Sequence, residues 1–596
     1  MKTIIHQADF CVVGGGLAGM CAAIAAARRG IKTVLMHDRP VLGGNASSEI
    51  RMWVCGAQGK NNLETGIIEE IRLENLYRNN YPNFSVWDSI LYEKVHFQKN
   101  LTLLLNCSCN QAKMSGDKIE RITGWQLTNE TFHTVEAQLF ADCSGDSILA
   151  PLSSAEFRMG REARDEFGES IAPEIADRKT MGMSCLIQAR ETDSPQKFIP
   201  PSWSNKYLSD ESFPNRGHML KGMQNFWWME IGGENDTIHD TETLRDELLK
   251  IAFGVWDHIK NYGDHGAENW VLEWVGFLPG KRESRRYVGD YIMTQNDVTA
   301  GGKFDDIVAY GGWSMDDHHP AGMNYPGMPT IFHPAPSPYG IPFRSLYSKN
   351  IDNLLFAGRN ISVTHSAMSS ARVMATCALL GQAAGTAAAL AVKNNLSPRG
   401  VYQNRLKELQ HNLLEDDCWL PGLRREVPVL SREAIISASV GNPEPLRDGI
   451  DRPVGGDENC WEGGIGEWVE YRFNNDEKIS QVRIIFDSNL NRSHLNAVAK
   501  YPLEMPVFSP PETLIKGFHI EVENCSGEIF EVHRENNNYQ RFVLLNLSIT
   551  ARRVRLCIDE VYGTGNKRIF AFDLDAIRCC IPASGIISGK QMSDQA

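Results

Sequence analysis

Closely spaced cysteines are rare in this chain, although it has 14 cysteines among 596 residues. Cys107/Cys109 and Cys579/Cys580 are the only near neighbours. No C-x-x-C pair occurs, which excludes the common cysteine frameworks for zinc and for iron–sulfur clusters. Cys55 stands alone, which excludes disulfide exchange by a closely spaced pair. We therefore expect reduced, mostly buried cysteines, no metal site and a cytoplasmic protein.

The sequence also lacks an excess of positive charge and an apolar targeting segment. Its formal net charge of −14 argues against nucleic acid and anionic lipid as partners. The N-terminus has no signal-peptide core. The apolar stretch Val373–Val392 is mostly Ala, Gly and Thr, which makes a poor bilayer span. We expect a buried core helix whose face of small residues (Cys377, Gly381, Gly385 and Ala388) packs against a sheet. The expected partner of the protein is a small-molecule substrate. The oligomeric state stays open.

A glycine-rich stretch at residues 9–30, DFCVVGGGLAGMCAAIAAARRG, organises the rest of the chain. It predicts a short buried strand, a tight turn and an alanine-rich helix. Gly14, Gly16 and Gly19 form a G-x-G-x-x-G pattern between strand and helix. The first glycine permits the turn, the second lets a pyrophosphate approach the backbone, and the third lets helix and strand pack closely. A following strand, Lys32–Met36, completes the context for dinucleotide binding.

The end of this second strand departs from the usual dinucleotide-binding pattern, which places an acidic residue there to hold ribose hydroxyls. The position falls on His37, with Asp38 and Arg39 next to it. Either a ring nitrogen of His37 binds the ribose or Asp38 does so after a small shift, and we favour a role shared by both. A second backbone-exposing turn follows at Gly43-Gly44-Asn45, and we expect it near the pyrophosphate.

Two later strand ends carry related motifs. One strand leads into Ser144-Gly145-Asp146, where the glycine exposes backbone and the aspartate can accept hydrogen bonds from a polyol. Strand Asn353–Ala357 leads into Gly358-Arg359-Asn360 and then into the small-residue helix. The residues expected to N-cap that helix are Ser362, Thr364 or Ser366, and its positive end would point between the domains.

The order of elements predicts an α/β fold with three parts. Residues 1–150 and 347–397 form a discontinuous, Rossmann-like dinucleotide-binding domain, with a β-meander over Lys118–Leu139. Residues 151–346 form an inserted α+β substrate domain with one clear helix, Thr241–Tyr262. Residues 398–425 are a helical linker, and residues 426–596 form a C-terminal β-sandwich.

Short strands are expected in both later parts. In the insert they span Gly182–Ala189, Asn225–Ile231 and Trp270–Leu278. In the C-terminal part they span Trp468–Phe473, Ile479–Phe486, Phe518–Val522, Arg541–Leu545, Arg553–Ile558 and Ile569–Ala576.

Taken in order, these glycine motifs and the later Gly381-Gln382-Ala383-Ala384-Gly385 resemble the family of FAD-dependent oxidoreductases with a glutathione-reductase-type FAD fold. The block PGKRESRRYVGD at residues 279–290 is similar to a characteristic segment of that family. The resemblance covers residues 8–395 and extends distantly to the flavin domain of heterodisulfide reductase, without the cysteines for its iron–sulfur cluster. It implies FAD as the cofactor. The region around Asp448-Gly449, Trp461 and Trp468–Tyr471 resembles a discoidin-type sandwich, a module that often binds carbohydrate.

An FAD enzyme that oxidises an alcohol needs a base for the hydroxyl proton while hydride passes to flavin N5. Histidine suits this role because its ordinary pKa lies near neutrality. The first candidate is His318, with a neighbouring aspartate as its orienter; the second is His365, and His333 lies in the same loop as the first. The alternative for each is a structural loop residue.

Arginine side chains are candidates for holding an anionic or polyhydroxylated substrate, because guanidinium groups match carboxylates and donate to hydroxyls. The candidates are Arg51, Arg285 and Arg372. The alternative for each is an ion pair between domains.

These features predict an FAD-dependent oxidoreductase of a small polar organic substrate, a sugar or glycoside in our first hypothesis. The hypothesis of a sugar substrate is based on the C-terminal module and on the Trp-, His- and Asp-rich loops of residues 311–344. Two alternatives stay open: an FAD-dependent reductase of a carbon–carbon double bond, and a carbohydrate-binding protein that uses the flavin fold as a scaffold. The insert has no second G-x-G-x-x-G motif, so no nicotinamide domain is expected.

Overall fold

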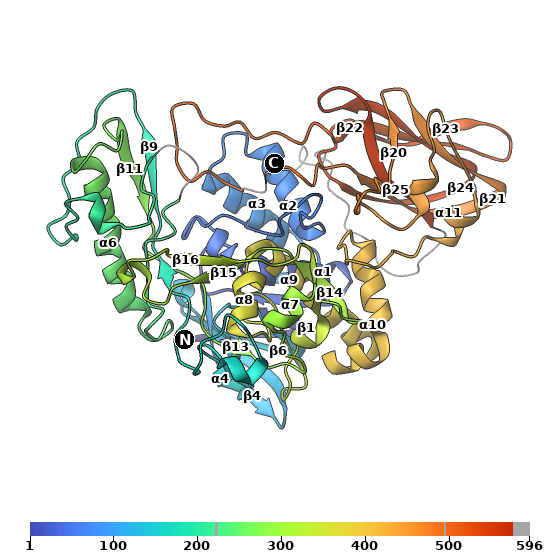
Figure 1. Ribbon diagram of the computed structural model, residues 1–596. Helices are drawn as coiled ribbons and strands as arrows, with labels where there is room; N and C mark the ends of the chain where they lie inside the picture. The colour runs from blue at the N-terminus through green and yellow to red at the C-terminus, as the bar shows by residue number, and fades with distance from the viewer. Residues whose placement is uncertain (221–224, 494–495, 576–596) are drawn as a thin grey trace.

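The first six strands of the chain and β18 form one seven-stranded sheet, of which Figure 1 labels β1, β4 and β6. The computed structural model describes residues 1–220, 225–493 and 496–575. The sheet has the order β3-β2-β1-β6-β5-β4, and β18 also pairs with β6. Its parallel strands are β1 (Lys2–Val13), β2 (Thr33–Met36), β3 (Leu101–Leu104), β6 (Thr131–Asp142) and β18 (Leu354–Phe356). The last residues of β1 and β2 and the whole of β18 are continuous apolar runs. Such runs are typical of parallel strands that are covered on both faces.

The other two strands of this sheet are antiparallel. β4 (Cys107–Ser115) pairs with β5 (Lys118–Gln126), and β5 pairs with the first half of β6. The predicted β-meander is confirmed. Two helices, α2 (Ile67–Arg78) and α3 (Phe84–His96), lie between β2 and β3 in the chain.

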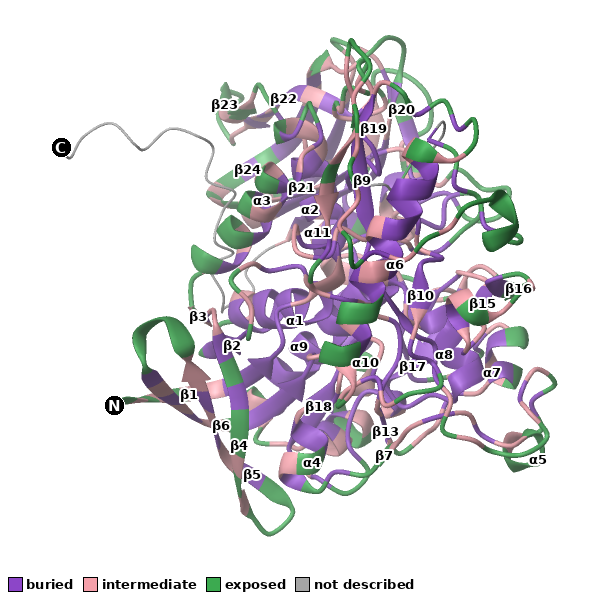
Figure 2. Cartoon of the chain, turned by 90° about the vertical axis from the view of Figure 1, so that its left-hand side faces the viewer, coloured by how far each residue is buried: buried purple, intermediate pink, exposed green. Residues whose placement is uncertain are grey.

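Helix α1 (Leu17–Arg28) packs against helix α9 (Met374–Asn394), and both are buried (Figure 2). α9 is the described helix that is long and apolar enough to cross a membrane, and 94% of its apolar window is buried inside the protein. The buried core helix is therefore confirmed, but its expected partner was wrong. A Cβ added at Gly381 or Gly385 would meet the carbonyl oxygen of Ala18 at 1.9 Å or of Ala22 at 2.1 Å, so the glycine face meets α1 rather than the sheet.

The predicted small-residue helix is two helices. Thr364 caps a short one, α8 (His365–Ala371), by accepting a hydrogen bond from the Ala367 N–H. α9 then begins at Met374, with Val373 at its N-cap and no side-chain cap. The expected capping residue is thus found, but it caps the short helix and not the long buried one.

The insert of residues 151–346 combines small sheets with one long helix, α6 (Thr241–Asn261), which confirms the helix predicted there. The predicted strand Gly182–Ala189 is two strands in different sheets, and the predicted strand Asn225–Ile231 is reduced to β10. The strands of this region are β7 (Phe157–Arg158), β8 (Met183–Ser184), β9 (Ile187–Glu191), β10 (Glu230–Ile231), β11 (Trp270–Val275), β12 (Gly280–Lys281), β13 (Arg286–Tyr287), β14 (Ile307–Gly311), β15 (Met315–His318), β16 (Thr330–His333) and β17 (Tyr339–Pro342). Its short helices are α4 (Leu149–Ser153), α5 (Arg164–Phe167) and α7 (Gln295–Thr299).

The C-terminal part is an antiparallel, sandwich-like sheet with its own core around Trp461, Tyr471 and Phe518. It follows helix α10 (Pro398–Glu415), which confirms a helix in the predicted linker, and the short helix α11 (Val429–Glu433). Its strands are β19 (Ile435–Ala438), β20 (Trp461–Gly463), β21 (Trp468–Phe486), β22 (Ile515–Glu523), β23 (Ile529–Glu535), β24 (Phe542–Val561) and β25 (Lys567–Asp575). Residues 576–596 of the predicted module, with Ala576 and Cys579/Cys580, lie outside the described residues.

Two of these strands are longer than predicted. β21 joins the predicted strands Trp468–Phe473 and Ile479–Phe486, and β24 joins Arg541–Leu545 and Arg553–Ile558. The register between β21 and β24 shifts after Arg472 and again after Ile479. Such bulges let one strand bend and continue. Because each bulge interrupts the alternation of side chains, sequence periodicity alone indicates two separate strands.

Buried polar contacts fix the C-terminal part to the preceding part of the chain. Arg492 pairs with Glu69 of α2 at 2.6 Å, and Arg541 pairs with Asp417 at 2.9 Å. Arg452 donates to the Thr65 hydroxyl at 2.7 Å. Glu69, Asp417, Arg452 and Arg541 are almost fully buried and each has a polar partner, so the two parts form a packed interface rather than a loose linkage.

Candidate active site

A cavity of about 570 Å³ opens at the carboxyl ends of the parallel strands. Strands β1, β2, β6 and β18 all end at this edge, which is where open α/β sheets bind their ligands. Of the residues predicted from the sequence, its wall includes Gly14, Gly16, His37, Asp38, Arg39, Gly43, Gly44, Asn45, Gly145, Asp146, His318, Gly358, Arg359 and Arg372. The structure therefore brings both glycine turns and the first-choice histidine to one cavity.

The three motif glycines differ in the space around them. Gly14 has φ +103° and its Cβ would lie 2.4 Å from the Cys143 carbonyl oxygen, so this position needs glycine for the turn itself. A Cβ at Gly19 would lie 1.8 Å from the Gly14 carbonyl oxygen, as close helix–strand packing requires. Gly16 is different: its added Cβ would meet only Gly44 Cα, at 3.9 Å. Because Gly16 lines the cavity and begins α1 without a side-chain cap, it leaves backbone N–H groups facing open space.

His37 is engaged by the protein on both ring nitrogens. Nδ1 accepts a hydrogen bond from the Gly15 N–H at 3.0 Å, and Nε2 donates to the Val41 carbonyl at 3.0 Å. Burial lowers the pKa of His37, in keeping with a neutral ring. The neighbouring Asp38 has a half-exposed side chain on the cavity wall. His37 therefore holds the glycine turn, and the half-exposed carboxylate at this strand end is that of Asp38, which lies 3.7 Å from the Arg39 guanidinium.

Asp146 is the centre of a polar network and not a free acceptor. Its carboxylate binds Lys281 at 2.8 Å, Arg359 at 2.9 Å and the Ser284 hydroxyl at 2.8 Å. Burial alone would raise the pKa of Asp146, but Arg359 and Lys281 outweigh it and bring the value down to about 2. A Cβ at Gly145 would collide with the Arg359 guanidinium at 2.7 Å, so this glycine makes room for the arginine.

Asn360 lies behind the cavity wall. It is fully buried and donates to the Asp142 carbonyl at 3.3 Å, which ties the end of β18 to the end of β6.

His318 lies on the cavity wall between two carboxylates. Its Nδ1 is 2.6 Å from Glu230 Oε2, and its Nε2 is 3.3 Å from Asp316 Oδ2. Arg282 pairs with Glu230 at 3.4 Å and Arg372 pairs with Asp316 at 3.1 Å. Burial alone would raise the pKa of Glu230, but Arg282 and His318 outweigh it and hold the value below its ordinary range. Both carboxylates are therefore ionised and orient the ring.

His365 lies outside the cavity wall and is fully buried at the start of α8. Its Nδ1 is 2.8 Å from Glu283 and its Nε2 is 3.2 Å from Asp317. Burial alone would lower the pKa of His365, but Glu283 and Asp317 outweigh it and raise the value to about 10. A histidine that keeps its proton at neutral pH is a poor base, and His365 is instead the cation that holds these two carboxylates together.

This buried cation makes a testable contribution to stability. The unfolded chain loses the His365 proton near pH 6.5, whereas the folded protein keeps it up to about pH 10. The contribution is full below pH 6.5, falls by about 1.4 kcal/mol per pH unit above it, and is gone above pH 10. We expect His365→Gln to flatten the decline of unfolding free energy across this window, measured by denaturant titration at several pH values. Parallel pH profiles for variant and wild type would contradict the assignment.

The other predicted side chains lie elsewhere. Arg51 donates to Gln188 at 2.5 Å and stacks 4.4 Å from the ring centroid of Trp274, and Arg285 lies over Phe157. Neither lines the cavity, and neither does His333 at the end of β16. Of the three candidate arginines, Arg372 is the one on the wall, where it binds Asp316.

Sequence analysis missed several residues of the wall, among them Trp227, Asn225 and Lys281, whereas Trp313 belongs to the loops of residues 311–344 that were expected to contact a sugar. Trp227 lies 5.2 Å from His318, ring centroid to ring centroid, and its carbonyl accepts from Arg282 at 2.9 Å. The Trp313 ring N–H and the Asn225 side-chain oxygen are buried and have no partner among the described residues. Glu230, the closest partner of His318, was missed as well. Lys281 and Arg282 stand in the block of residues 279–290, which was the available signal.

Thiol chemistry finds no support at this cavity. Cys55 lines the wall, and burial raises the pKa of the Cys55 thiol to about 11, so it is a neutral thiol and a poor nucleophile. Most cysteines of the described chain are buried, which confirms that part of the expectation, and those described are free.

The fold and the cavity define a class: an α/β protein that binds a dinucleotide cofactor across the carboxyl ends of a parallel sheet. The chain belongs to the FAD dependent oxidoreductase family, whose model matches residues 9–413. The resemblance stated from the motifs is thereby confirmed, and the protein is an FAD-dependent oxidoreductase with FAD as its cofactor. No match was found among curated proteins.

Solved structures similar to one quarter of the chain are carbohydrate-binding modules. The family 32 module of EndoD from Streptococcus pneumoniae is 14% identical, with a TM-score of 0.19, and the match covers 25% of this chain and 97% of that chain. The family 32 module of NanJ from C. perfringens, solved with galactose, is 12% identical, with a TM-score of 0.19 and coverages of 25% and 97%. Scores of this size do not assign a function to the C-terminal part.

The residues of the cavity fit FAD. Gly16 and Gly44 leave a cradle beside the uncapped start of α1, and a Cβ at Gly44 would lie 3.1 Å from Gly16 Cα. α9 also begins at the cavity without a side-chain cap, with Val373 and Met374 on the wall. Both helices therefore offer positive N-terminal ends to an anionic group.

Proposed function

We propose that this protein dehydrogenates a small hydroxylated substrate, a sugar or glycoside. The observation that supports it is the single cavity that holds the glycine cradle together with His318, its two carboxylates and Trp227. A base next to an aromatic wall and the cofactor cradle is the combination that oxidation of a sugar hydroxyl requires.

The cradle residues would hold FAD. The backbone at Gly14–Gly16 and the start of α1 would bind the pyrophosphate, with Gly43 and Gly44 closing the other side. We assign the ribose contact to Asp38, because both nitrogens of His37 are used by Gly15 and Val41. When bound, the flavin supplies the acceptor for the substrate's hydride.

His318 would accept the hydroxyl proton at Nε2. Glu230 Oε2, at 2.6 Å, is the closer of the two carboxylate partners and would hold the proton on Nδ1, so that Nε2 would be the accepting atom. Asp316, held by Arg372 and Thr330, lies 3.3 Å from Nε2 and would stabilise the positive charge that the ring gains.

The rest of the wall would recognise the sugar. Trp227, Trp313 and Phe332 offer ring faces and edges to the apolar side of a pyranose. The unpartnered Trp313 N–H and Asn225 oxygen would exchange hydrogen bonds with hydroxyl groups. A few polar groups among the aromatic side chains of a cavity are the usual basis for orienting such a ligand.

A second candidate, reduction of a carbon–carbon double bond, is favoured by one contact. Asp316 lies close to Nε2 of His318, and a carboxylate there stabilises the doubly protonated ring. A histidine that holds a proton in the resting protein would donate it to the substrate carbon in the reductive direction.

The test is the visible absorption spectrum of the purified protein, recorded anaerobically before and after addition of sugars and glycosides. We expect the flavin bands to bleach with one class of sugar. Free FAD with the same panel is the control. If no sugar bleaches the bands, but photoreduced protein is reoxidised by an unsaturated compound, the reductase replaces the dehydrogenase. Bleaching by neither class would contradict both proposals.

A further inference from the structure

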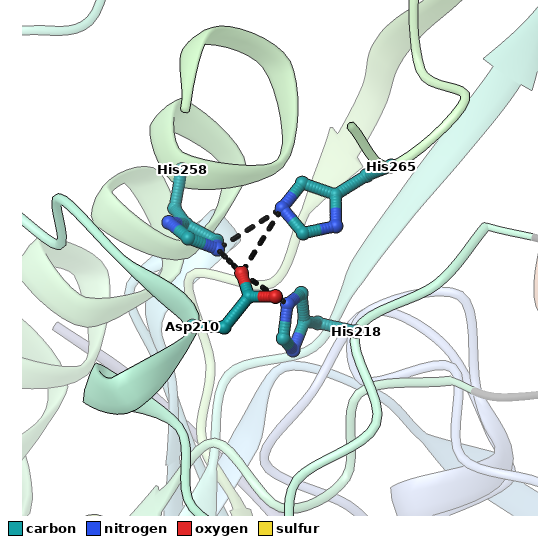
Figure 3. A group of neighbouring side chains, drawn as sticks. All are labelled: Asp210, His218, His258 and His265. Atoms are coloured by element: carbon teal, nitrogen blue, oxygen red, sulfur yellow. Dashed lines mark hydrogen bonds and ion pairs between the residues drawn. The ribbon is translucent and has the colours of Figure 1, made fainter. Parts of the chain in front are cut away.

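Three histidines and one aspartate converge in the insert, away from the cavity (Figure 3). Asp210 begins a short helical turn, His218 follows in the next loop, His258 lies near the end of α6, and His265 follows α6. The rings of His258 and His265 are almost fully buried, whereas Asp210 is exposed to solvent. Their coordinating atoms all lie within 4.8 Å of one another.

The spacing of these atoms matches donors around one small cation. Asp210 Oδ1 lies 3.0 Å from His258 Nε2, 3.4 Å from His218 Nε2 and 3.5 Å from His265 Nε2. The Nε2 atoms of His258 and His265 are 3.1 Å apart. Tetrahedral ligands with zinc bonds of about 2.0–2.1 Å are separated by about 3.3–3.4 Å. These four contacts are close to four of the six edges of a zinc tetrahedron, and the other two, from His218 to the other two rings, are within 4.8 Å.

Two of the rings are set in the tautomer that binds a metal through Nε2. His258 Nδ1 lies 2.9 Å from the Tyr207 carbonyl, and His218 Nδ1 lies 3.0 Å from the Arg216 carbonyl. A carbonyl oxygen only accepts, so each Nδ1 carries a proton, and each Nε2 points to Asp210 at the centre, where a bound metal would replace the Nε2 proton that faces the carboxylate. Backbone carbonyls that orient the second nitrogen in this way are the usual outer support of metal-binding histidines.

His265 has to change one contact. Its Nε2 lies 3.0 Å from the Tyr262 carbonyl as well as 3.1 Å from His258 Nε2. Without a metal, the Nε2 proton is shared between these acceptors; with one, the proton moves to Nδ1 and the lone pair completes the set.

We propose that Asp210, His218, His258 and His265 bind one Zn²⁺ ion. Imidazole nitrogens with one carboxylate oxygen in tetrahedral spacing suit zinc, and four protein ligands make a closed, structural site. None of the four lines the cavity, which agrees with a structural role.

The ion would fasten a segment that has little regular structure of its own. Between β9 and β10 the described residues contain one three-residue helical turn, Asp210–Ser212. The proposed zinc ties this segment to α6. The same segment continues into Asn225, Trp227 and Glu230 of the cavity region, so the ion would also steady the wall that carries Trp227.

Metal analysis of the purified full-length protein tests the proposal. We expect about one zinc per chain by inductively coupled plasma mass spectrometry, removal by a chelator with a lower Tm, and recovery of both on adding Zn²⁺ alone. Flavin content should not change, because the four residues lie outside the cradle. Stripped protein that takes up no zinc at micromolar concentration overturns the site.

Variants separate these ligands from ordinary histidines. Asp210→Asn removes the exposed carboxylate without disturbing the core, and His258→Ala removes a buried ligand. Each should weaken zinc affinity by about 100-fold or more, since even outer-shell changes cost about 10- to 100-fold. His239→Ala is the control, because His239 is exposed and bonds only within its own turn, to Asp236. Affinities equal to wild type in both ligand variants would refute the assignment.

Discussion

His318→Gln should lower the rate of substrate-driven flavin reduction by about 10²- to 10⁴-fold, the usual loss when a positioned proton acceptor is removed. The glutamine amide can still donate to Glu230, so the buried carboxylate keeps a partner besides Arg282. It cannot take a proton at the place of Nε2. Flavin content and Tm should therefore stay close to wild type while the rate, measured by anaerobic stopped-flow absorbance, collapses.

His333→Ala is the matched control for this variant. His333 stands on β16, the partner strand of β15, which carries His318, but it does not line the cavity. Its removal should leave the rate unchanged. Glu230→Gln should give a smaller loss together with a changed pH profile of the rate, because it alters how the ring is oriented and charged. A His318→Gln enzyme that reduces its flavin at the wild-type rate would remove His318 as the proton acceptor.

The parts of this protein that could be predicted are those encoded in short stretches. The turn at Gly14, the strand end before Asp146 and the helix Thr241–Asn261 each depend on residues that are neighbours in sequence. Parallel strands place their carboxyl ends at one edge, so separate glycine motifs could be assigned to one site before any coordinates existed. The cavity wall contains most of them.

The predictions that failed concern contacts between residues that are far apart in the sequence. Glu230 sits on a two-residue strand, and 88 positions separate it from His318. The sequence predicts a longer strand there, Asn225–Ile231, but nothing in it indicates that Glu230 contacts His318. The composition of the small-residue face of α9 is equally compatible with packing against a sheet or against another helix. The close approach of Gly381 to Ala18 in the structure shows that this face packs against α1.

The proposed zinc ligands show the same limit. The expectation of no metal rested on cysteine spacing, whereas Asp210, His218, His258 and His265 come from two loops and a helix without a recognisable interval. The prediction for His37 is wrong in a different way. Its position was predicted, but its ring nitrogens bond to Gly15 and Val41 and not to a ligand in the cavity.

Gly16→Val should weaken FAD binding and leave the fold intact. Gly16 has φ −66° and ψ 174°, an extended conformation that valine adopts readily. Its added Cβ has no neighbour closer than Gly44 Cα at 3.9 Å, so the new side chain occupies the cradle and not the core. Overpacking at a close contact costs about 1–3 kcal/mol, which corresponds to FAD binding weakened roughly 5- to 150-fold.

The contrast with Gly14→Val makes this prediction specific. At Gly14 the side chain would strike the Cys143 carbonyl at a φ of +103°, so that variant should lower Tm whether or not FAD is present. Fluorescence titration of the deflavinated proteins with FAD, and Tm measured without FAD, separate the two effects. If Gly16→Val binds FAD as tightly as wild type, the pyrophosphate does not lie against the start of α1. If it loses Tm in the absence of FAD as Gly14→Val does, the position serves the fold, and the cradle must be sought at Gly43 and Gly44 on the facing turn.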